Sequence, residues 1–237
     1  MKRLDFWVGG AASLALLYAS WRGWAPFGLT PFSMTEALGF VTGAICVYLV
    51  VKENVWNFPI GIANSVFFLI LFAETRLYGD ASLQIIYIVL GFQGWYLWLR
   101  GGENRTPLHV ERASRRLLAG VAAFVGVGTI GLTFIFRYVQ DSEPFLDAST
   151  TILSLGAQYL LNRKAVENWL LWMTADVLYI YLFYFKRDLQ LTAVLYLVFL
   201  CLCVAGLRSW LRTMSERGRV MEDTATVVEA GGGAVRG

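Results

Sequence analysis

The sequence has little charge, a single histidine and only three cysteines. Charged residues make up 16% of the 237 residues, whereas hydrophobic residues make up 57% and aromatic residues 15%. Cys46, Cys201 and Cys203 lie in apolar segments, at a spacing that fits neither a zinc site nor a disulfide framework. A net charge of +3 is too small to indicate a nucleic-acid-binding surface. We therefore expect no metal, no cofactor and no nucleic-acid partner.

The sequence also lacks the motifs of an enzyme and the composition of a soluble domain. It contains no G-x-x-x-x-G-K-[ST] motif and no evident pairing of a nucleophile with a base, so neither ATP hydrolysis nor other catalysis is expected. The strict alternation of apolar and polar residues that a membrane β-barrel requires is missing. What is present is a series of apolar segments of about twenty residues. They predict an all-α polytopic membrane protein, because a helix satisfies its own backbone hydrogen bonds in lipid.

Eight apolar segments are expected to span the membrane. They are 5–20, 34–51, 56–73, 81–99, 117–136, 145–161, 166–186 and 189–211. The first belongs to an N-terminal helix and loop, 1–33, and the fifth to a cytoplasmic loop and linking helix, 100–144. Two three-helix units, 34–99 and 145–212, flank the linking helix. The polar, glycine-rich end, 213–237, is expected to be disordered.

Basic residues are distributed unequally between the expected loops. The loop 100–116 contains five arginines, and Lys and Arg gather on the cytoplasmic side of membrane proteins. With this loop in the cytoplasm, fifteen of the twenty Lys and Arg side chains lie on the cytoplasmic side and five on the other. Both termini are therefore expected to be cytoplasmic, in agreement with an even number of membrane crossings.

The two three-helix units align with each other when the sequence is shifted by 112 residues, without a gap. The shift pairs Asn64 with Asp176, Gly94 with Gly206 and Trp98 with Trp210, and it places Trp56-Asn57 on Asn168-Trp169 in reversed order. This predicts two parallel repeats, because a single linking helix between three-helix units gives both the same direction through the membrane. Small membrane proteins built in this way are usually transporters, with the site at the repeat interface near the membrane midplane.

The segment 166–186 carries the strongest signal of a binding site. Asn168, Trp172, Asp176 and Tyr179 follow one another at i, i+4, i+8 and i+11, so they share one helical face. A carboxylate in the middle of a membrane helix costs several kcal/mol unless it faces protein, water or a ligand. The face therefore predicts a polar, aromatic pocket. The same pattern has an alternative interpretation, in which the tryptophans are packing residues or interface anchors and Asp176 pairs with a neighbouring helix.

Other expected helices carry amides and aromatic side chains on one face as well. Asn57 and Asn64 share a face of the segment 56–73, and Gln84 and Tyr87 lie on a stripe of the segment 81–99. Gln158 lies in the segment 145–161. Buried amides need partners. Some of these amides can hydrogen-bond to a neighbouring helix. The presence of amides and aromatic side chains on several facing helices nevertheless favours a central substrate site.

Three runs of this sequence resemble a known family. The resemblance covers about residues 34–212 and rests on WNFPIGIANSVFFLILF, RLYGDASLQIIYIVLGFQGWYLW and VENWLLWMTADVLYIYLFYFK. These runs are similar to those of the PnuC nicotinamide riboside transporters. The pair Trp169-x-x-Trp172 is the most specific element, and it adds Trp169 to the expected substrate-binding residues.

The resemblance implies a fold similar to that of the SWEET sugar transporters and a homotrimer in the bacterial inner membrane, in contact with lipid. It implies facilitated diffusion of nicotinamide riboside, with uptake driven by phosphorylation inside the cell. Related members carry thiamine or riboflavin, so these remain alternative substrates. An intramembrane enzyme acting on a lipid-linked substrate and a non-transporting scaffold are the alternatives from other classes.

The charge bias leads to a test of topology. Reporter fusions after Arg105 and after Gly237 should both report a cytoplasmic location, because both positions lie on the side that is rich in Lys and Arg. A periplasmic signal from either fusion would show that the number of helices or the orientation is wrong.

Overall fold

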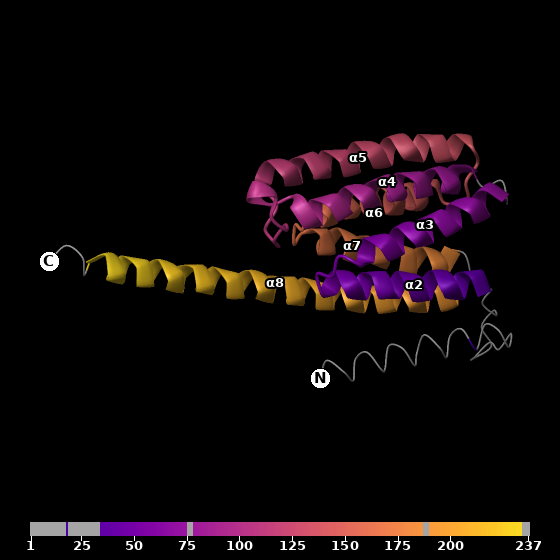
Figure 1. The fold of residues 1–237 in the computed structure, drawn as a ribbon. Helices are drawn as coiled ribbons and strands as arrows, with labels where there is room; N and C mark the ends of the chain where they lie inside the picture. Colours follow the sequence, from indigo (N-terminus) through magenta and orange to yellow (C-terminus); the bar gives the residue numbers. More distant parts are fainter. Residues whose placement is uncertain (1–17, 19–33, 75–77, 187–189, 234–237) are drawn as a thin grey trace.

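The computed structural model describes residues 18, 34–74, 78–186 and 190–233 (Figure 1). Their helices are α2 (Met34–Val51), α3 (Asn57–Glu74), α4 (Tyr78–Arg100), α5 (Arg115–Tyr138), α6 (Pro144–Asn162), α7 (Asn168–Tyr181) and α8 (Gln190–Gly233). A π-helical turn, Leu182–Lys186, follows α7. The described chain contains no β-strand, so it is all-helical as predicted. The expected helix at 5–20 lies outside the described residues, apart from Tyr18.

Four segments of the described chain are long and apolar enough to cross a membrane. They are Asn57–Glu74, Ala81–Arg100, Arg115–Tyr138 and Tyr196–Met221. Helices α6 and α7 carry more polar residues, among them the buried side chains of Ser154, Asn162, Asn168 and Asp176. Polar residues inside a helix bundle are tolerated where they face other helices or a cavity rather than lipid. The buried polar side chains of α6 and α7 are therefore a first indication that a polar interior lies beside them.

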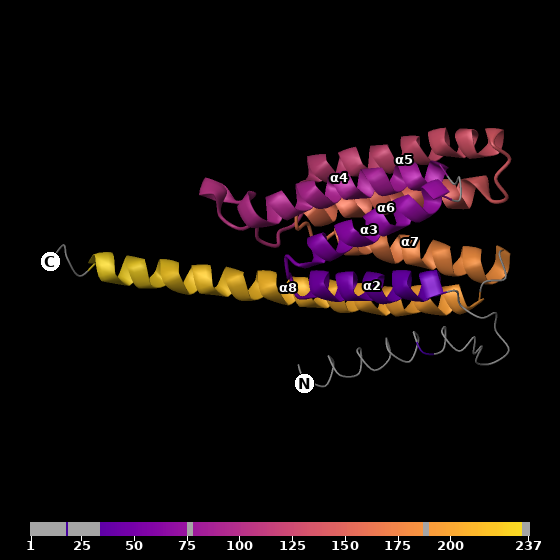
Figure 2. The same ribbon diagram turned by 45° about the vertical axis from the view of Figure 1, so that its right-hand side comes forward.

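Six helices form the bundle, and α5 lies outside it. In Figures 1 and 2, α5 runs along one side of the molecule, and it packs against α6. Helix α2 packs against α3 and α8, and α4 packs against α3 and α6. We call α2–α4 the first half and α6–α8 the second half. The contacts α2–α8 and α4–α6 join these halves, so any space between them is bounded by both.

Helix α8 continues well beyond the segment expected to span the membrane. The structure shows a helix up to Gly233, where the sequence predicts a disordered tail from residue 213. Figure 1 shows this extension, in yellow, projecting away from the bundle. Extending an existing helix avoids the cost of nucleation, which is the step that makes short isolated helices unstable. The prediction treated the tail as an isolated segment and so missed this continuity.

Two tryptophans tie the halves together at the end of the bundle that contains the α2–α3 and α6–α7 turns. The indole Nε1 of Trp98 on α4 donates to the carbonyl oxygen of Leu161 on α6 at 3.0 Å. Trp210 on α8 donates in the same way to Val50 on α2, also at 3.0 Å. Both acceptors lie in the last turn of a helix, and each also accepts a backbone N–H from the following turn, of Lys164 and Glu53 respectively, at 2.9 Å.

The same tryptophans pack edge-on against an aromatic residue at the start of a neighbouring helix. Phe58 of α3 meets Trp98 with ring centroids 5.1 Å apart and an interplanar angle of 87°. Trp169 of α7 meets Trp210 at 5.3 Å and 81°. These edge-to-face geometries are favourable for aromatic pairs. The two tryptophans themselves are 6.0 Å apart, so the aromatic contacts continue from one half into the other.

Two glycines leave room for these rings. A Cβ atom at Gly94 would lie 2.3 Å from the ring of Phe58, and one at Gly206 would lie 2.4 Å from the ring of Trp169. Any side chain at either position would displace a buried ring. The glycines therefore allow α4 and α8 to approach the starts of α3 and α7 closely.

Matched contacts at the starts of α3 and α7 correct the gap-free alignment. Asn57 donates through Nδ2 to the carbonyl oxygen of Asn54, and Asn168 donates to that of Ala165, at 2.8 and 2.6 Å. These asparagines differ by 111 positions in the sequence, whereas Trp98 and Trp210, whose contacts also match, differ by 112. A single shift therefore does not pair both sets of matching contacts. A shift of 111 places Asn57 on Asn168, where the shift of 112 gives the Trp-Asn and Asn-Trp pairs in reversed order.

The indole bonds lead to a test of stability. Trp210→Phe keeps an aromatic ring but removes one of the two donors to the carbonyl oxygen of Val50, which retains the backbone N–H of Glu53, so the loss should be about 0.5–1.5 kcal/mol. The apparent melting temperature in detergent should fall by about 2–4 °C for each kcal/mol lost. Trp56→Phe is the matched control, because the side chain of Trp56 is 64% exposed, and it should melt like the parent. Equal melting temperatures for both variants would contradict this role of Trp210.

Candidate functional site

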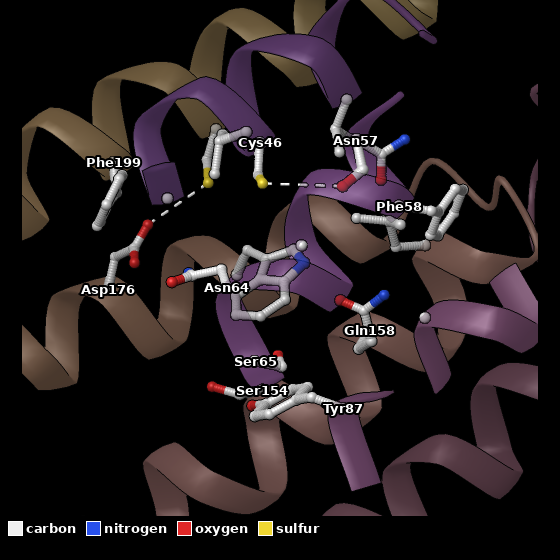
Figure 3. A pocket seen from close by; sticks show the side chains of 18 of the residues that line it. Cys46, Asn57, Phe58, Asn64, Ser65, Tyr87, Ser154, Gln158, Asp176 and Phe199 are labelled. Carbon is white, nitrogen blue, oxygen red and sulfur yellow. Dashed lines mark hydrogen bonds between the residues drawn. The ribbon is translucent and has the colours of Figure 1, made fainter. Parts of the chain in front are cut away.

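A cavity of about 350 Å³ lies between the two halves of the bundle. All six helices of the bundle contribute to its wall, which is drawn in Figure 3. Small residues on α2, α3 and α4 line part of it, namely Gly43, Gly61 and Gly91. In Figure 3, Asn64, Gln158 and Asp176 place polar atoms along the pocket, with Tyr87 and Ser154 side by side at one end. The cavity is thus a mixed aromatic and polar site, as expected for an organic ligand.

The cavity brings together eight of the ten substrate-binding residues predicted from the sequence. They are Asn57, Asn64, Tyr87, Gln158, Trp169, Trp172, Asp176 and Tyr179. These residues come from α3, α4, α6 and α7, which lie far apart in the sequence. Their convergence follows from the packing of α4 on α6 and of α7 on α8.

Asn168 and Gln84 are not among the described lining residues. Asn168 is completely buried at the start of α7, where its Nδ2 donates to Ala165. It belongs to the turn between α6 and α7 rather than to the cavity wall. Gln84 lies on α4, three residues before Tyr87, and is partly exposed. The helical stripe places Gln84 on the correct helix, but its side chain does not reach the cavity.

The two tryptophans of the Trp169-x-x-Trp172 pair have different surroundings. Trp169 is 1% exposed and packs against Trp210, so it is a core residue as well as part of the wall. Its Nε1 has no hydrogen-bond partner within the described part of the chain. A buried donor without a partner costs about 1–3 kcal/mol, which a ligand with an acceptor could restore. Trp172 is only partly buried, and its ring is therefore the better stacking surface.

A network of amides holds Gln158 in position. Gln158 donates through Nε2 to Oδ1 of Asn162 at 2.9 Å. Asn162, which is completely buried, in turn donates to the carbonyl oxygen of Leu90 at 2.8 Å and to Gln93 at 3.3 Å. The bonds to Leu90 and Gln93 cross from α6 to α4. They fix the Gln158 amide before any ligand arrives, which lowers the entropy lost on binding.

Two cysteines line the cavity, although the sequence identified them only as packing residues. The thiol of Cys203 on α8 donates to Oδ2 of Asp176 on α7 at 3.4 Å, and the thiol of Cys46 contacts the carbonyl oxygen of Asn57 at 3.8 Å. Figure 3 shows both contacts as dashed lines. Asp176 lines the cavity and also accepts a weak bond from α8.

Helix α8 supplies aromatic residues that the sequence interpretation did not include. Tyr196 stacks on Tyr179 of α7 with ring centroids 4.5 Å apart and meets Phe199 edge-on at 5.7 Å. Tyr196, Phe199 and Cys203 follow one another at i, i+3 and i+7, which places them on one face. That spacing is a signal that could have identified this side of the cavity.

An ion pair lies at the tryptophan-rich end of the cavity. Lys164 Nζ is 3.2 Å from Glu53 Oε2, and the same ammonium lies 4.5 Å from the centre of the Trp98 ring. Glu53 and Lys164 both have a positive φ, at 53° and 50°, in the turns that follow α2 and α6. The two residues are 111 positions apart, as are Asn57 and Asn168. This pair and the two indole bonds join the halves at the same end.

These features define a helical membrane protein whose two halves enclose a site for a small organic molecule. The sequence profile of the family described as nicotinamide mononucleotide transporter matches residues 33–212. The chain therefore belongs to this family of membrane transporters. Membership of a transporter family sets aside the intramembrane enzyme and the scaffold as alternatives.

Characterised relatives cover most of the chain. The nicotinamide riboside transporter PnuC of Escherichia coli (strain K12) is 26% identical over 212 residues, which is 78% of this chain and 88% of that protein. PnuC of Neisseria mucosa is 29% identical, over 78% of this chain and 74% of that protein. The riboflavin/roseoflavin transporter RibM of Streptomyces davaonensis is 26% identical, over 79% and 90%.

A solved structure has the same fold. The crystal structure of the vitamin B3 transporter PnuC superposes with a TM-score of 0.62 and 24% sequence identity, covering 88% of this chain and 92% of that one. This similarity supports the helical architecture on which the cavity depends.

The cavity wall leads to a test of Trp172. Trp172→Ala should remove a stacking surface while keeping the helix, because Ala is a good helix former. Affinity for nicotinamide riboside should fall about ten- to a hundredfold, equivalent to roughly 1–3 kcal/mol. Calorimetric titration of the purified variant measures this loss.

The control for Trp172 is Phe134→Leu on α5, where Phe134 is 66% exposed and distant from the bundle interior. The control should bind like the parent protein. Unchanged binding by Trp172→Ala, with its melting temperature also unchanged, would place the stacking surface elsewhere.

Proposed function

We propose that this protein carries nicotinamide riboside across the bacterial inner membrane by facilitated diffusion. The observation that carries this proposal is the composition of the cavity wall, which combines aromatic rings with amides and contains no Lys, Arg or His among its described residues. Substrate would enter from one side, the halves would rearrange to open the other side, and phosphorylation in the cytoplasm would prevent its return.

The groups of the cavity suit the parts of this substrate. A pyridinium ring stacks on tryptophan with up to about 2 kcal/mol when it is desolvated, and Trp172 offers such a surface. The carboxamide and ribose hydroxyls require donors and acceptors, which Asn64, Gln158 and Ser154 supply. The unpaired Nε1 of Trp169 is a donor suited to an oxygen of the ligand. In this proposal every polar part of nicotinamide riboside has a candidate partner.

The mononucleotide named in the family description is less suited to the cavity. It carries a phosphate, which proteins usually hold with Arg, Lys or a cluster of backbone N–H groups. The described wall provides no basic side chain, and it contains the acid Asp176. Thiamine and riboflavin, which lack a phosphate, remain the alternative substrates, and the similarity to a riboflavin transporter keeps the latter in the test.

The matched contacts of the two halves support an arrangement of two parallel three-helix repeats joined by α5. Equivalent residues of the halves meet directly at Glu53–Lys164 and at Trp98–Trp210. Repeats of this kind permit alternating access by movement of one half relative to the other around a fixed site. In this proposal the tryptophan-rich end is the cytoplasmic gate, closed as it stands in the structure.

The assembly and orientation complete the proposal. Both termini lie in the cytoplasm, in agreement with the excess of Lys and Arg on that side. The exposed apolar surface of α4 and α5, which includes Val89, Phe92, Ile130 and Phe134, faces lipid or a second subunit. The protein acts as a homotrimer, a state that size-exclusion chromatography with light scattering measures directly.

Reconstitution into liposomes tests the function. Vesicles without an ion gradient or a membrane potential should fill with radiolabelled nicotinamide riboside only to the external concentration. The mononucleotide should neither enter nor compete at equal concentration. Protein-free vesicles are the control. Uptake of riboflavin or thiamine in place of nicotinamide riboside would assign a different substrate, and accumulation driven by a proton or sodium gradient would refute facilitated diffusion.

A further inference from the structure

The cavity contains one acidic side chain without a basic partner. Asp176 is 4% exposed and is the one Asp or Glu among the described lining residues, which include no Lys, Arg or His. Its hydrogen-bond donor is the thiol of Cys203, at 3.4 Å. A thiol is neutral and a weak donor, so it cannot compensate a negative charge. Burying a carboxylate without such compensation is costly.

The nearest ion pair does not supply that compensation. Lys164 is held 3.2 Å from Glu53 and lies against the ring of Trp98. The charges of Lys164 and Glu53 therefore neutralise each other, at the tryptophan-rich end of the cavity. Lys164 is absent from the cavity wall, and the charge of Asp176 is left for a ligand to meet.

The rest of the wall also favours a positive charge. Rings from four helices line the cavity, and the face of an aromatic ring attracts cations. The rings belong to Phe58, Tyr87, Trp169, Trp172, Tyr179, Tyr196 and Phe199. Tyr196 and Tyr179 stack on each other between α7 and α8, the two helices that also carry Cys203 and Asp176. The acid and the rings thus form one continuous surface.

We propose that Asp176 is the counter-ion of the substrate and determines its charge, so that the site selects planar ring compounds with one fixed positive charge over neutral and anionic analogues. This inference rests on the proposed transport function and specifies its substrate class. The pyridinium of nicotinamide riboside meets this requirement, and so does the thiazolium of thiamine. Riboflavin has no fixed positive charge, and a phosphorylated ligand would bring negative charge toward the carboxylate.

A matched pair of ligands tests this inference without any mutation. Nicotinamide riboside and its 1,4-dihydro form have the same ribose and carboxamide, but only the former carries the ring charge. Calorimetry on the full-length parent protein should give an affinity at least about thirtyfold higher for the cation, the lower end of the scale expected when one charged partner is removed from a buried pair. Equal affinities for the two forms would overturn the inference.

The variant Asp176→Asn tests whether this carboxylate causes the preference for the cationic ligand. The amide keeps the shape and a hydrogen-bonding oxygen but removes the charge. Affinity for the cation should fall at least about thirtyfold, whereas affinity for the dihydro form should stay within about twofold of the parent. Loss of affinity for both forms alike would identify Asp176 as a structural residue and refute the assignment, as would a variant that retains the preference.

Two further experiments distinguish failure of the charge inference from failure of the proposed function. Cys203→Ala removes the thiol but keeps the carboxylate, so the preference for the cation should persist. If neither form of nicotinamide riboside binds but thiamine does, and Asp176→Asn weakens thiamine, the substrate proposal fails and the charge inference holds. Preferential binding of riboflavin over both cations would refute the charge inference.

Discussion

Two indole N–H groups fasten the halves of the bundle to each other at one end. Trp98 and Trp210 each donate to a carbonyl oxygen in the last turn of a helix from the opposite half, at Leu161 and Val50. Each of these carbonyl oxygens also accepts a backbone N–H from the turn that follows its helix, of Lys164 and Glu53 respectively, at 2.9 Å, so the indole is its second donor. The two indole bonds position α4 and α8 against the opposite half. The edge-on contacts of Phe58 with Trp98 and of Trp169 with Trp210, the closeness permitted by two glycines and this end of the cavity all depend on that position.

The same end contains the ion pair between Glu53 and Lys164, each in a turn with positive φ. A left-handed conformation for residues other than Gly is unfavourable and persists only where the surrounding contacts require it. Here the turn after α2 and the turn after α6 adopt it in the same way. The side chains of Lys164 and Glu53 are only 9% and 24% exposed, so the ion pair is largely buried, and removal of one partner would leave an uncompensated charge. The ion pair and the indole bonds therefore both hold the halves together at this end.

The sequence was sufficient for the seven helices from α2 to α8 and for most of the cavity wall, for a definite physical reason. Membrane helices are bounded by polar turns, and polar residues that recur at helical spacing must face a protein interior, so both can be identified locally. The difference of one residue between the two sets of matching contacts could not be predicted. It shows only in which asparagine caps which turn, at Asn57 and Asn168, and that is a tertiary contact. Cys46 and Cys203 were missed because a thiol is a common packing residue in any apolar segment.

If the ligand is a monocation, the membrane potential can favour its uptake even though the sequence has no energy-coupling motif. In the proposal, Asp176 balances the ligand while it is bound, and the charge that crosses the membrane in a full cycle is that of the ligand. Moving one positive charge inward through a potential of about 100 mV, negative inside, gains about 2.3 kcal/mol. That energy corresponds to about a fiftyfold accumulation at equilibrium. A neutral ligand such as riboflavin gains nothing from the potential and would depend on trapping alone. One uncompensated carboxylate in an aromatic cavity would thus set both which ligand is accepted and how far its uptake proceeds.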